Sequence, residues 1–303
     1  MNLKNLKLEF FHIRKAFLVY GHGWAYLYYR YIVAPKIFRL KTPLDRPINY
    51  SDLSVHILTC HRDLLMFIWS LASFYRHGEM IGQVVVHNDG SLTAADQRLI
   101  KRLFPSVAIY QTSDFLKDYQ SNFNNYQILN DFRANYKKFS FKKLIDPYFV
   151  STKSFRLVID SDLFWFGPPI IIKQALDSSD DKSLMQQNNI PIYVSFKDGS
   201  RVADYLAQAN SGIVFYRQES FDLEKLAEFL TKLDTKVEKN LYFADQLGYA
   251  YSLKNLSFLP PEIYPIKSPW TNEISIKHYT GPRRSLFYVE GVKRLAKEIL
   301  NIK

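Results

Sequence analysis

The chain has 303 residues, of which 47% are hydrophobic and 23% are charged, so it can bury a core and is not an intrinsically disordered chain. The single cysteine, Cys60, excludes an intrachain disulfide framework and a cysteine-rich zinc site. The formal net charge is +11, and the first fifty residues hold +7 of it. A basic surface attracts polyanions such as acidic lipids, nucleic acids or phosphorylated substrates.

The first fifty residues combine this charge with clustered aromatic side chains, a composition typical of a membrane–water interface. We expect a helical extension over residues 1–50, followed by a main domain over residues 51–303. Two interpretations are open: an amphipathic anchor that contacts an anionic membrane through residues 1–35, or helices packed against the main domain. Two glycines and Arg30 argue against a membrane-spanning helix. No signal-peptide pattern is present, and we expect a cytoplasmic protein, peripheral at a membrane surface.

After residue 50, short apolar runs alternate with helical patterns, which indicates βαβ units and a mostly parallel central sheet flanked by helices. Thr93 precedes one helical pattern in the position of an N-cap. Such sheets bind ligands at the carboxyl ends of their strands. The expected strands are residues 54–59, 83–87, 107–110 and 155–159, and the expected helices are residues 63–76, 94–103 and several within 113–145.

Two common nucleotide-binding motifs are absent from the chain. No G-x-G-x-x-G follows the first expected strand, and no G-x-x-x-x-G-K-[ST] occurs anywhere. This argues against dinucleotide-dependent oxidoreductases and P-loop NTPases. The polar residues that do follow the strands are residues 60–62, 87–90 and 160–162.

Asp160 and Asp162 follow an apolar strand and are separated by one residue, so in an extended backbone both carboxylates point to one face. Carboxylates this close repel one another unless a cation neutralises them, and hard oxygen ligands suit Mg²⁺ or Mn²⁺ held jointly with a substrate phosphate. The structural alternative is a solvated turn. A phosphatase of the haloacid dehalogenase type also uses an aspartate pair, but near the start of its chain. The mid-chain position here favours nucleotide-sugar transfer.

Five motifs, in this order along residues 54–290, resemble those of the GT-A glycosyltransferases, most closely family 8, the glycogenin and bacterial galactosyltransferase type. Each motif is short, and the specific signal is their shared order and spacing. The motifs are Lys143-Leu144, Leu157–Asp162, Asn210-Ser211-Gly212 before an expected strand at 213–216, Asp245-Gln246, and His278–Arg284 after a strand-like segment at 273–277.

The resemblance implies a GT-A, Rossmann-like fold and assigns roles to residues. The cofactor it implies is Mn²⁺ or Mg²⁺. The implied metal ligands are Asp160, Asp162 and His278; the implied catalytic residues are Lys143, Asp245 and Gln246; the implied donor-sugar contacts are Asn210, Ser211 and Asp245; and the implied diphosphate contacts are Gly281 and Arg284. Thr59, His61, Asp89 and Ser161 are further expected nucleotide contacts, because they lie at the carboxyl ends of the expected strands.

The chain departs from the family pattern at several positions. The family's phosphate-binding lysine is Arg284 here, and an arginine keeps the charge and can bind phosphate through two N–H groups. Ser285-Leu286 replaces the usual Pro-Trp, and Ala250 lies near the place of an asparagine. The loop at residues 59–62 matches no family pattern.

The resemblance implies transfer of a sugar from a nucleoside diphosphate, with a UDP-hexose as the expected donor, to a hydroxyl of a glycan or lipid-linked glycan, with retention of configuration. Residues 110–141 and 256–270 are rich in aromatic side chains that would either contact the acceptor or pack in the core. No nucleic acid partner is expected. The alternatives are a basic membrane- or nucleic-acid-binding module without catalysis, a metal-dependent phosphatase, and a nucleotide-binding pseudoenzyme.

Overall fold

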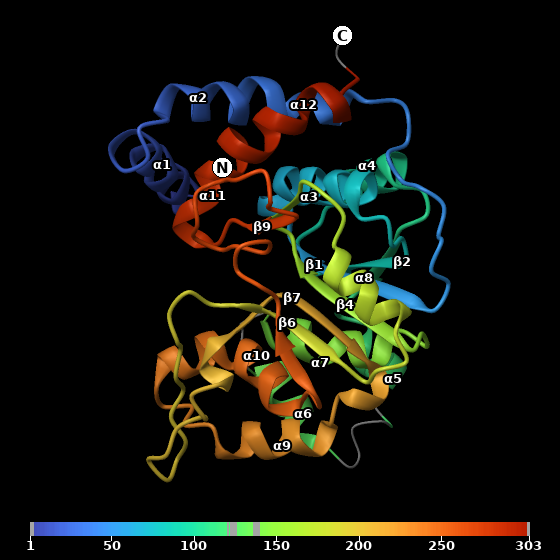
Figure 1. Ribbon diagram of the computed structural model, residues 1–303, viewed down its shortest axis with the longest axis vertical. Coiled ribbons are helices and arrows are strands. Elements are labelled where there is room, and N and C mark those ends of the chain that lie inside the picture. The colour runs from blue at the N-terminus through green and yellow to red at the C-terminus, as the bar shows by residue number, and fades with distance from the viewer. Residues whose placement is uncertain (1–2, 120, 122–125, 136–139, 302–303) are drawn as a thin grey trace.

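The structure is a computed structural model that describes residues 3–119, 121, 126–135 and 140–301. A central sheet lies between two layers of helices (Figure 1). One layer holds α3, α4, α12 and the N-terminal helices, and the other holds α6, α7, α9 and α10. The predicted α/β architecture is confirmed.

The central sheet has seven strands in the order β3-β2-β1-β4-β7-β6-β8. Strands β3, β2, β1 and β4 run parallel, β7 runs antiparallel to β4 and β6, and β8 runs parallel to β6. The mostly parallel sheet predicted from the sequence is therefore present. The strands are β1 (Leu53–Thr59), β2 (Gln83–Asn88), β3 (Ala108–Gln111), β4 (Phe155–Asp160), β6 (Ser183–Gln187), β7 (Ala209–Arg217) and β8 (Leu256–Phe258).

The parallel half of the sheet places its polar strand ends together. The chain builds β1, β2 and β3 in one direction and then returns to place β4 on the other side of β1. The register pairs Thr59 with Asn88 and Leu58 with Asp160, so these strands end at the same edge. A reversal of strand order leaves a crevice at the carboxyl ends of β1 and β4, which is where α/β sheets bind ligands.

A second, two-stranded sheet brings a distant segment to this edge. Strand β5 (Leu163–Trp165) follows Asp162 directly and pairs antiparallel with β9 (Ile276–His278), with Leu163 opposite His278. The sequence predicted a strand-like segment at 273–277 that ends before His278, and this boundary is wrong because the histidine is the last residue of β9. Likewise, Asn210-Ser211-Gly212 lies inside β7, not before it.

The helices α3 and α4 begin and end within one residue of the predicted positions. Thr93 caps α4: its hydroxyl accepts a hydrogen bond from the Asp96 backbone N–H at 3.2 Å, and the Asp96 carboxylate accepts one from the Thr93 N–H at 2.8 Å. Where the structure describes it, the predicted helical region after β3 contains three α-helices. The helices are α3 (Leu64–His77), α4 (Ala94–Leu103), α5 (Phe115–Tyr119), α6 (Gln127–Asn135), α7 (Ser140–Val150), α8 (Ile170–Asp177), α9 (Leu223–Lys232) and α10 (Glu238–Ser252).

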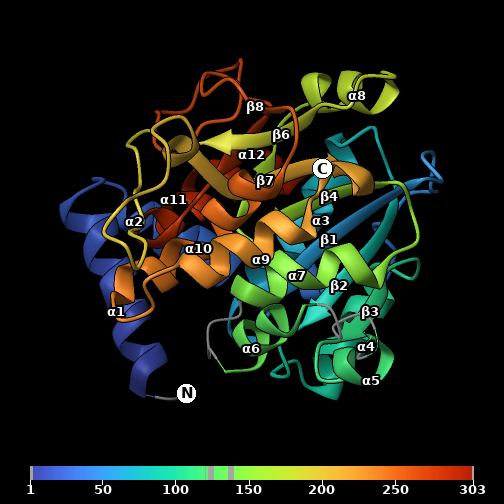
Figure 2. The ribbon, with the colours of Figure 1, turned by 90° about the horizontal axis from the view of Figure 1, so that it is seen from below.

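The N-terminal helices pack beside the C-terminal ones, as the adjacent blue and red ribbons in Figures 1 and 2 show. Tyr26 is buried, and its hydroxyl donates to Glu9 at 2.7 Å. Arg30 lies over the ring of Tyr288, 5.0 Å from its centroid. The N-terminal elements are α1 (Leu3–Leu18), α2 (Gly23–Leu27), η1 (Tyr28–Val33) and η2 (Ala34–Arg39), and the C-terminal ones are η7 (Gly281–Arg283), α11 (Arg284–Leu286), η8 (Phe287–Val292) and α12 (Lys293–Ile299).

Among the described residues, every helix is too short or too polar to cross a bilayer. The expectation that helices of the first fifty residues pack on the rest of the chain agrees with these contacts. The division of the chain at residue 50 stays a prediction.

Candidate functional site

Two adjoining cavities, of about 750 and 720 Å³, open at the carboxyl ends of β1 and β4. They share a wall that includes Asp160, Asp162, Asp245 and Arg284. All fourteen residues that the sequence analysis singled out line one cavity or the other. The first cavity holds Asn210, Ser211, Gln246, His278 and Gly281, the second holds Thr59, His61, Asp89, Lys143 and Ser161, and the shared wall holds the remaining four.

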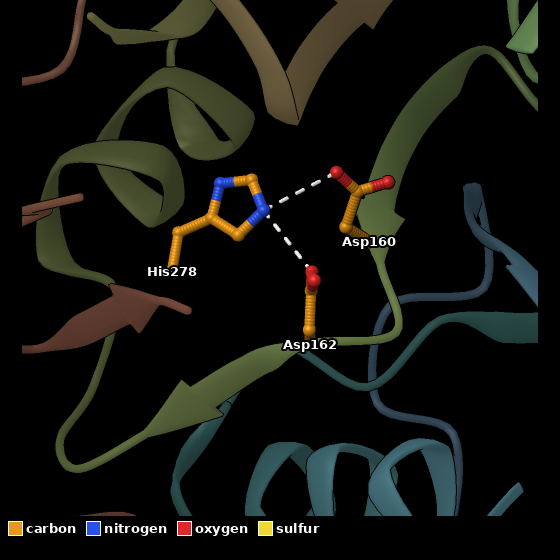
Figure 3. A group of neighbouring side chains, drawn as sticks. All are labelled: Asp160, Asp162 and His278. Atoms are coloured by element: carbon orange, nitrogen blue, oxygen red, sulfur yellow. Dashed lines mark hydrogen bonds and ion pairs between the residues drawn. The ribbon is translucent and has the colours of Figure 1, made fainter. Parts of the chain in front are cut away.

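Asp160, Asp162 and His278 converge on one point of the shared wall (Figure 3). Nε2 of His278 lies 3.1 Å from Asp162 Oδ1 and 3.3 Å from Asp160 Oδ2. One ligand atom from each residue lies within 4.8 Å of the other two. Two carboxylate oxygens and one imidazole nitrogen form a donor set suited to Mn²⁺ or Mg²⁺ with positions left for substrate oxygens.

The hydrogen bond at Nδ1 of His278 determines which ring nitrogen carries the proton. The side-chain amide of Gln186 donates to the backbone carbonyl of Tyr264 at 3.0 Å, which leaves its oxygen, 2.9 Å from His278 Nδ1, as an acceptor. Nδ1 therefore carries the proton. In the neutral ring the lone pair is on Nε2, the nitrogen that faces the aspartates. Metal-binding histidines are held by the same kind of outer hydrogen bond, so these residues fit a metal ion.

Gly212 in β7 leaves the space that the histidine ring occupies. A Cβ at this position would lie 2.2 Å from His278 Nδ1 and 2.6 Å from Gln186 Oε1. No side chain tolerates such distances. The glycine of the Asn-Ser-Gly motif is therefore required by the packing of His278, a role that the sequence did not indicate.

Each carboxylate of the aspartate pair is held by a different cation. Lys143 Nζ donates to Asp160 Oδ1 at 2.6 Å and also to the carbonyl and hydroxyl of Ser211. Arg284 donates from Nε to Asp162 at 3.1 Å and from Nη1 to both oxygens of Asp63 at 3.1 Å. Both cations therefore border the aspartate pair directly.

Charge pairing in this low-dielectric wall shifts several pKa values. Burial alone would raise the pKa of Asp160, but Lys143 and His278 outweigh it and hold that pKa well below its usual range. Burial alone would lower the pKa of His278, but Asp162 and Asp160 raise it to about 9. Without a metal, a proton on Nε2 thus bridges the two carboxylates.

The pKa values of two neighbouring carboxylates, Asp63 and Asp245, are shifted as well. Burial opposes ionisation of Asp63, but Arg62 and Arg284 lower its pKa to about 2. The pKa of Asp245 is raised, because its burial outweighs the charge of Lys143 and the hydroxyl of Ser211.

The first cavity carries a chain of amide and hydroxyl groups. Asn210 donates to Asn188 Oδ1 at 2.9 Å and to Gln246 Oε1 at 3.1 Å. The hydroxyl of Ser211 donates to Asp245 at 2.7 Å. Asn210, Ser211, Asp245 and Gln246 are buried yet line the cavity, and they provide donors and acceptors that match sugar hydroxyls.

The second cavity carries the residues predicted to contact the nucleotide. The hydroxyl of Thr59 is buried and has no hydrogen-bond partner among the described residues. Asp89 accepts from the backbone N–H and hydroxyl of Ser91, at 2.8 and 2.6 Å. Nδ1 of His61 lies 2.7 Å from Asp96 in the cap of α4. These residues line one cavity, but His61 and Asp89 are held by local contacts.

Sequence reasoning missed several residues that line the cavities or support the site. Asp63 was noted only as lying at the start of α3, and Gln186 and Asn188 carried no motif. Helix α1 supplies wall residues that no local pattern indicated, because their position depends on packing against the other end of the chain. The missed residues include Leu8, Phe11, His12, Asp63, Ser91, Ser140, Gln186, Asn188 and Tyr242.

The aromatic segments 110–141 and 256–270 supply no aromatic side chain, among the described residues, to either cavity. Phe115, Phe132 and Phe141 are buried in a core cluster, and Tyr264 is fully buried. Of the two interpretations of these segments, the structure agrees with the core.

Comparison with solved structures identifies the fold. The galactosyltransferase LgtC, solved with donor and acceptor sugar analogs, aligns at a TM-score of 0.51 and 10% identity, over 82% of this chain and 95% of LgtC. The chain has the GT-A glycosyltransferase fold. The bifunctional glycosyltransferase WbbM aligns at a TM-score of 0.49 and 12% identity, over 86% of this chain but 53% of WbbM, so this chain spans about half of that protein.

Mouse xyloside xylosyltransferase 1 aligns at a TM-score of 0.48 and 10% identity, over 77% of this chain and 98% of that protein. No protein-family model and no curated protein sequence matches the chain. At these identities the GT-A likeness concerns the fold. The likeness confirms, for the fold, the GT-A resemblance that the order of the motifs predicted.

Proposed function

We propose that this chain is a metal-dependent glycosyltransferase that moves a sugar from a nucleoside diphosphate donor, a UDP-hexose, to a hydroxyl of a glycan or lipid-linked glycan. The observation that carries the proposal is the triad of Asp160, Asp162 and His278, with Lys143 and Arg284 beside it, at the strand-end crevice of a GT-A fold.

Asp160, Asp162 and His278 would hold Mn²⁺ or Mg²⁺. A bound divalent ion would neutralise the charge that develops on the leaving diphosphate. The protein's own cations would add to this. Arg284 offers a planar pair of N–H donors suited to phosphate oxygens, and Nζ of Lys143 lies 2.6 Å from Asp160 Oδ1.

The first cavity would bind the donor sugar. Asn210 and Gln246 are joined by one hydrogen bond, and Asp245 accepts from Ser211, so each group is oriented before a sugar arrives. Preorganised hydrogen-bonding groups bind a sugar in one pose and hold its reacting carbon in place. We assign Asp245 and Gln246 to the face of that sugar. Retention of configuration belongs to this proposal through the family resemblance.

The second cavity would bind the nucleotide. Thr59, Asp89 and Ser161 line it, and the hydroxyl of Thr59, which has no partner among the described residues, can contact a base or ribose. Gly281, with φ +41, brings its backbone to the edge of the first cavity without a side chain.

The acceptor would enter beside α1. Leu8, Phe11 and His12 of α1 and Tyr242 of α10 line the first cavity, whereas Thr59 lines the second. Peripheral contact of residues 1–35 with a membrane would bring a lipid-linked acceptor to this wall.

The test is a panel of UDP-, GDP- and ADP-sugars with Mn²⁺, in which nucleotide release is measured for the wild type and for Asp162→Ala. Many transferases hydrolyse their donor slowly without acceptor. We expect release from one donor, loss of release on chelation of the metal, and no release by the variant.

The matched control is Asp198→Ala, which removes a carboxylate that lines neither cavity. Asp198 lies in an exposed turn and bonds only Ser200 among the described residues. This variant should release nucleotide at the wild-type rate. Release of phosphate from simple esters, with none from any nucleotide sugar, would instead identify a phosphatase.

A further inference from the structure

Helix α1 presents an exposed face of apolar and basic side chains. With successive residues turned by about 100°, one continuous arc of the helix carries Leu6, Phe17, Phe10, Arg14, Lys7, Leu18 and Phe11, and all seven are exposed. Phe10 is 67% exposed and Leu18 is 72% exposed. The opposite face of α1 holds the buried Ala16 and His12.

The elements after α1 extend this face. Trp24 is 78% exposed, and Ile32 is 56% exposed. The edge of the Phe17 ring meets Trp24, with centroids 5.5 Å apart. Ten of the sixteen large hydrophobic side chains exposed among the described residues lie between residues 6 and 32: Leu6, Phe10, Phe11, Phe17, Leu18, Val19, Trp24, Tyr28, Tyr31 and Ile32. We call these ten the N-terminal apolar patch.

The charges around the N-terminal apolar patch have one sign. Lys7 and Arg14 are exposed on the same arc, and no ion pair joins either to a residue that the structure describes. The one acidic side chain in residues 3–44, Glu9, turns inward: it accepts from Tyr26 and Tyr31 at 2.7 and 2.6 Å and lies 3.8 Å from Arg30. The outward-facing charge is therefore positive.

The patch borders the candidate site. Phe11 is 41% exposed and lines the first cavity, and Leu8 and His12, on the adjoining face of α1, line it too. A surface that covered the patch would lie beside the opening of that cavity.

We propose that the N-terminal apolar patch docks on an anionic bilayer, with its aromatic side chains in the headgroup region and the neighbouring Lys7 and Arg14 against acidic lipids. An amphipathic face of aromatic and basic residues has the composition of helices that lie in this region. Docking would place the cavity opening at the surface that holds a lipid-linked acceptor. The catalytic role of docking therefore rests on the proposed transferase function.

A second copy of the chain is the less suitable occupant. Two such patches facing one another would bring the unpaired Lys7 and Arg14 of both copies together, and like charges repel. An acidic lipid surface supplies the opposite charge over the whole area.

The experiment is co-sedimentation of the full chain with vesicles of phosphatidylcholine alone and of phosphatidylcholine mixed with phosphatidylglycerol. We expect binding to the mixed vesicles that weakens as salt rises. Phe10→Ser/Trp24→Ser should bind about tenfold or more weakly, and Lys7→Gln/Arg14→Gln should lose about fivefold for each charge removed. The matched control, Ile170→Ser/Ile190→Ser, removes two exposed apolar side chains outside the patch and should bind as the wild type does.

The four tryptophans provide a test of orientation. Trp24 is exposed and Trp270 is half-buried, whereas Trp69 and Trp165 are fully buried. Brominated lipids should quench the fluorescence of the bound wild type, and most of this quenching should be lost in Trp24→Phe, a variant that keeps an aromatic ring for binding.

Three results would overturn the proposal: no sedimentation of the wild type with anionic vesicles, equal binding by the patch variants, or a dimer that Phe10→Ser/Trp24→Ser dissociates while vesicles bind neither protein. Nucleotide release in solution is measured on the same samples and should not change in these variants. Vesicle binding without nucleotide release by the wild type would leave docking in place and remove the transferase, and the reverse result would remove docking alone.

Discussion

His278 shows how single contacts determine what the candidate site can bind. Its Nδ1 faces Gln186, its Nε2 faces two carboxylates, and Gly212 leaves room for the ring. Gln186 lies in β6 and Gly212 in β7, whereas the carboxylates come from the end of β4 and from the turn that follows it. The position of the nitrogen ligand thus depends on a glutamine and a glycine that would not themselves contact a metal.

Gly212→Ala tests this dependence. The added methyl group would lie 2.2 Å from His278 Nδ1, so the ring must move away from the aspartates. We expect Mn²⁺ to bind about tenfold or more weakly, as when an outer-shell partner of a metal ligand is lost. Calorimetric titration of Mn²⁺ measures this.

The matched control is Gly167→Ala. The nearest atom to its added methyl group is 4.0 Å away, an ordinary contact distance. This variant should bind Mn²⁺ as the wild type does. If Gly212→Ala also did so, with its circular dichroism unchanged, the histidine would not be a ligand.

At the scale of the element, the side chains of His56 and His87 form a contact between the neighbouring strands β1 and β2. The two rings are buried, with His56 Nδ1 at 2.9 Å from His87 Nε2. Burial, with a contribution from Arg133, lowers the pKa of His87 to about 3, and burial next to His87 lowers that of His56 well below its ordinary value. Both rings are therefore neutral in the folded protein.

This pair predicts a loss of stability in mild acid. A lowered folded-state pKa means that the unfolded chain binds the proton more tightly, so the free energy of unfolding falls once the pH drops below about 6.5. Between about pH 7.5 and about pH 5, His87 should account for a loss of about 2 kcal/mol. Urea unfolding at both pH values measures it.

His87→Gln keeps a hydrogen-bonding group beside His56 and removes the titration. It should lose about 2 kcal/mol less than the wild type between the two pH values. His22→Gln, at an exposed position, should follow the wild type. Equal losses in His87→Gln and the wild type would mean that the buried ring does not determine the acid sensitivity.

The local sequence pattern predicted which strands and helices are present more accurately than it predicted their first and last residues. Runs such as residues 54–59 and 83–87 are apolar because both faces of a central parallel strand are buried, and the sequence shows this directly. Asn210 and Gly212 have low strand propensity, so the sequence placed them outside β7. Pairing with β6, across an irregularity between Met185 and Gln186, extends the strand over them.

The same limit applies to the candidate site. The aspartate pair could be predicted because both residues follow one strand, and the other motif residues because their order resembles a known family. Gln186 and His12 could not be predicted. Gln186 acts through a partner 92 residues away, and His12 reaches the cavity only because α1 packs against α11.

At the scale of the whole molecule, the two ends of the chain form one wall of the cavity. Ala34 and Ile37 are fully buried, and the indole N–H of Trp69 in α3 donates to the Ala34 carbonyl at 3.0 Å. The N-terminal helices therefore contribute to the core as well as to the proposed membrane surface.

Deletion of residues 1–35 should lower stability by several kcal/mol, because it removes buried apolar side chains such as Tyr26 and leaves the indole of Trp69 without its acceptor. Thermal unfolding followed by circular dichroism measures this. An unchanged midpoint of thermal unfolding would show that residues 1–35 do not stabilise the rest of the chain. Membrane docking, tested by vesicle binding of the substitution variants, would then be the remaining role proposed for this segment.

A metal–diphosphate site on the GT-A fold is tested most directly by calorimetric titration of UDP into the full chain with Mn²⁺, with chelator in place of Mn²⁺, and into Asp162→Asn with Mn²⁺. We predict binding that requires Mn²⁺ and is lost in the variant. UDP binding of equal strength in all three samples, or none in any of them with GDP and ADP also silent, would contradict the account.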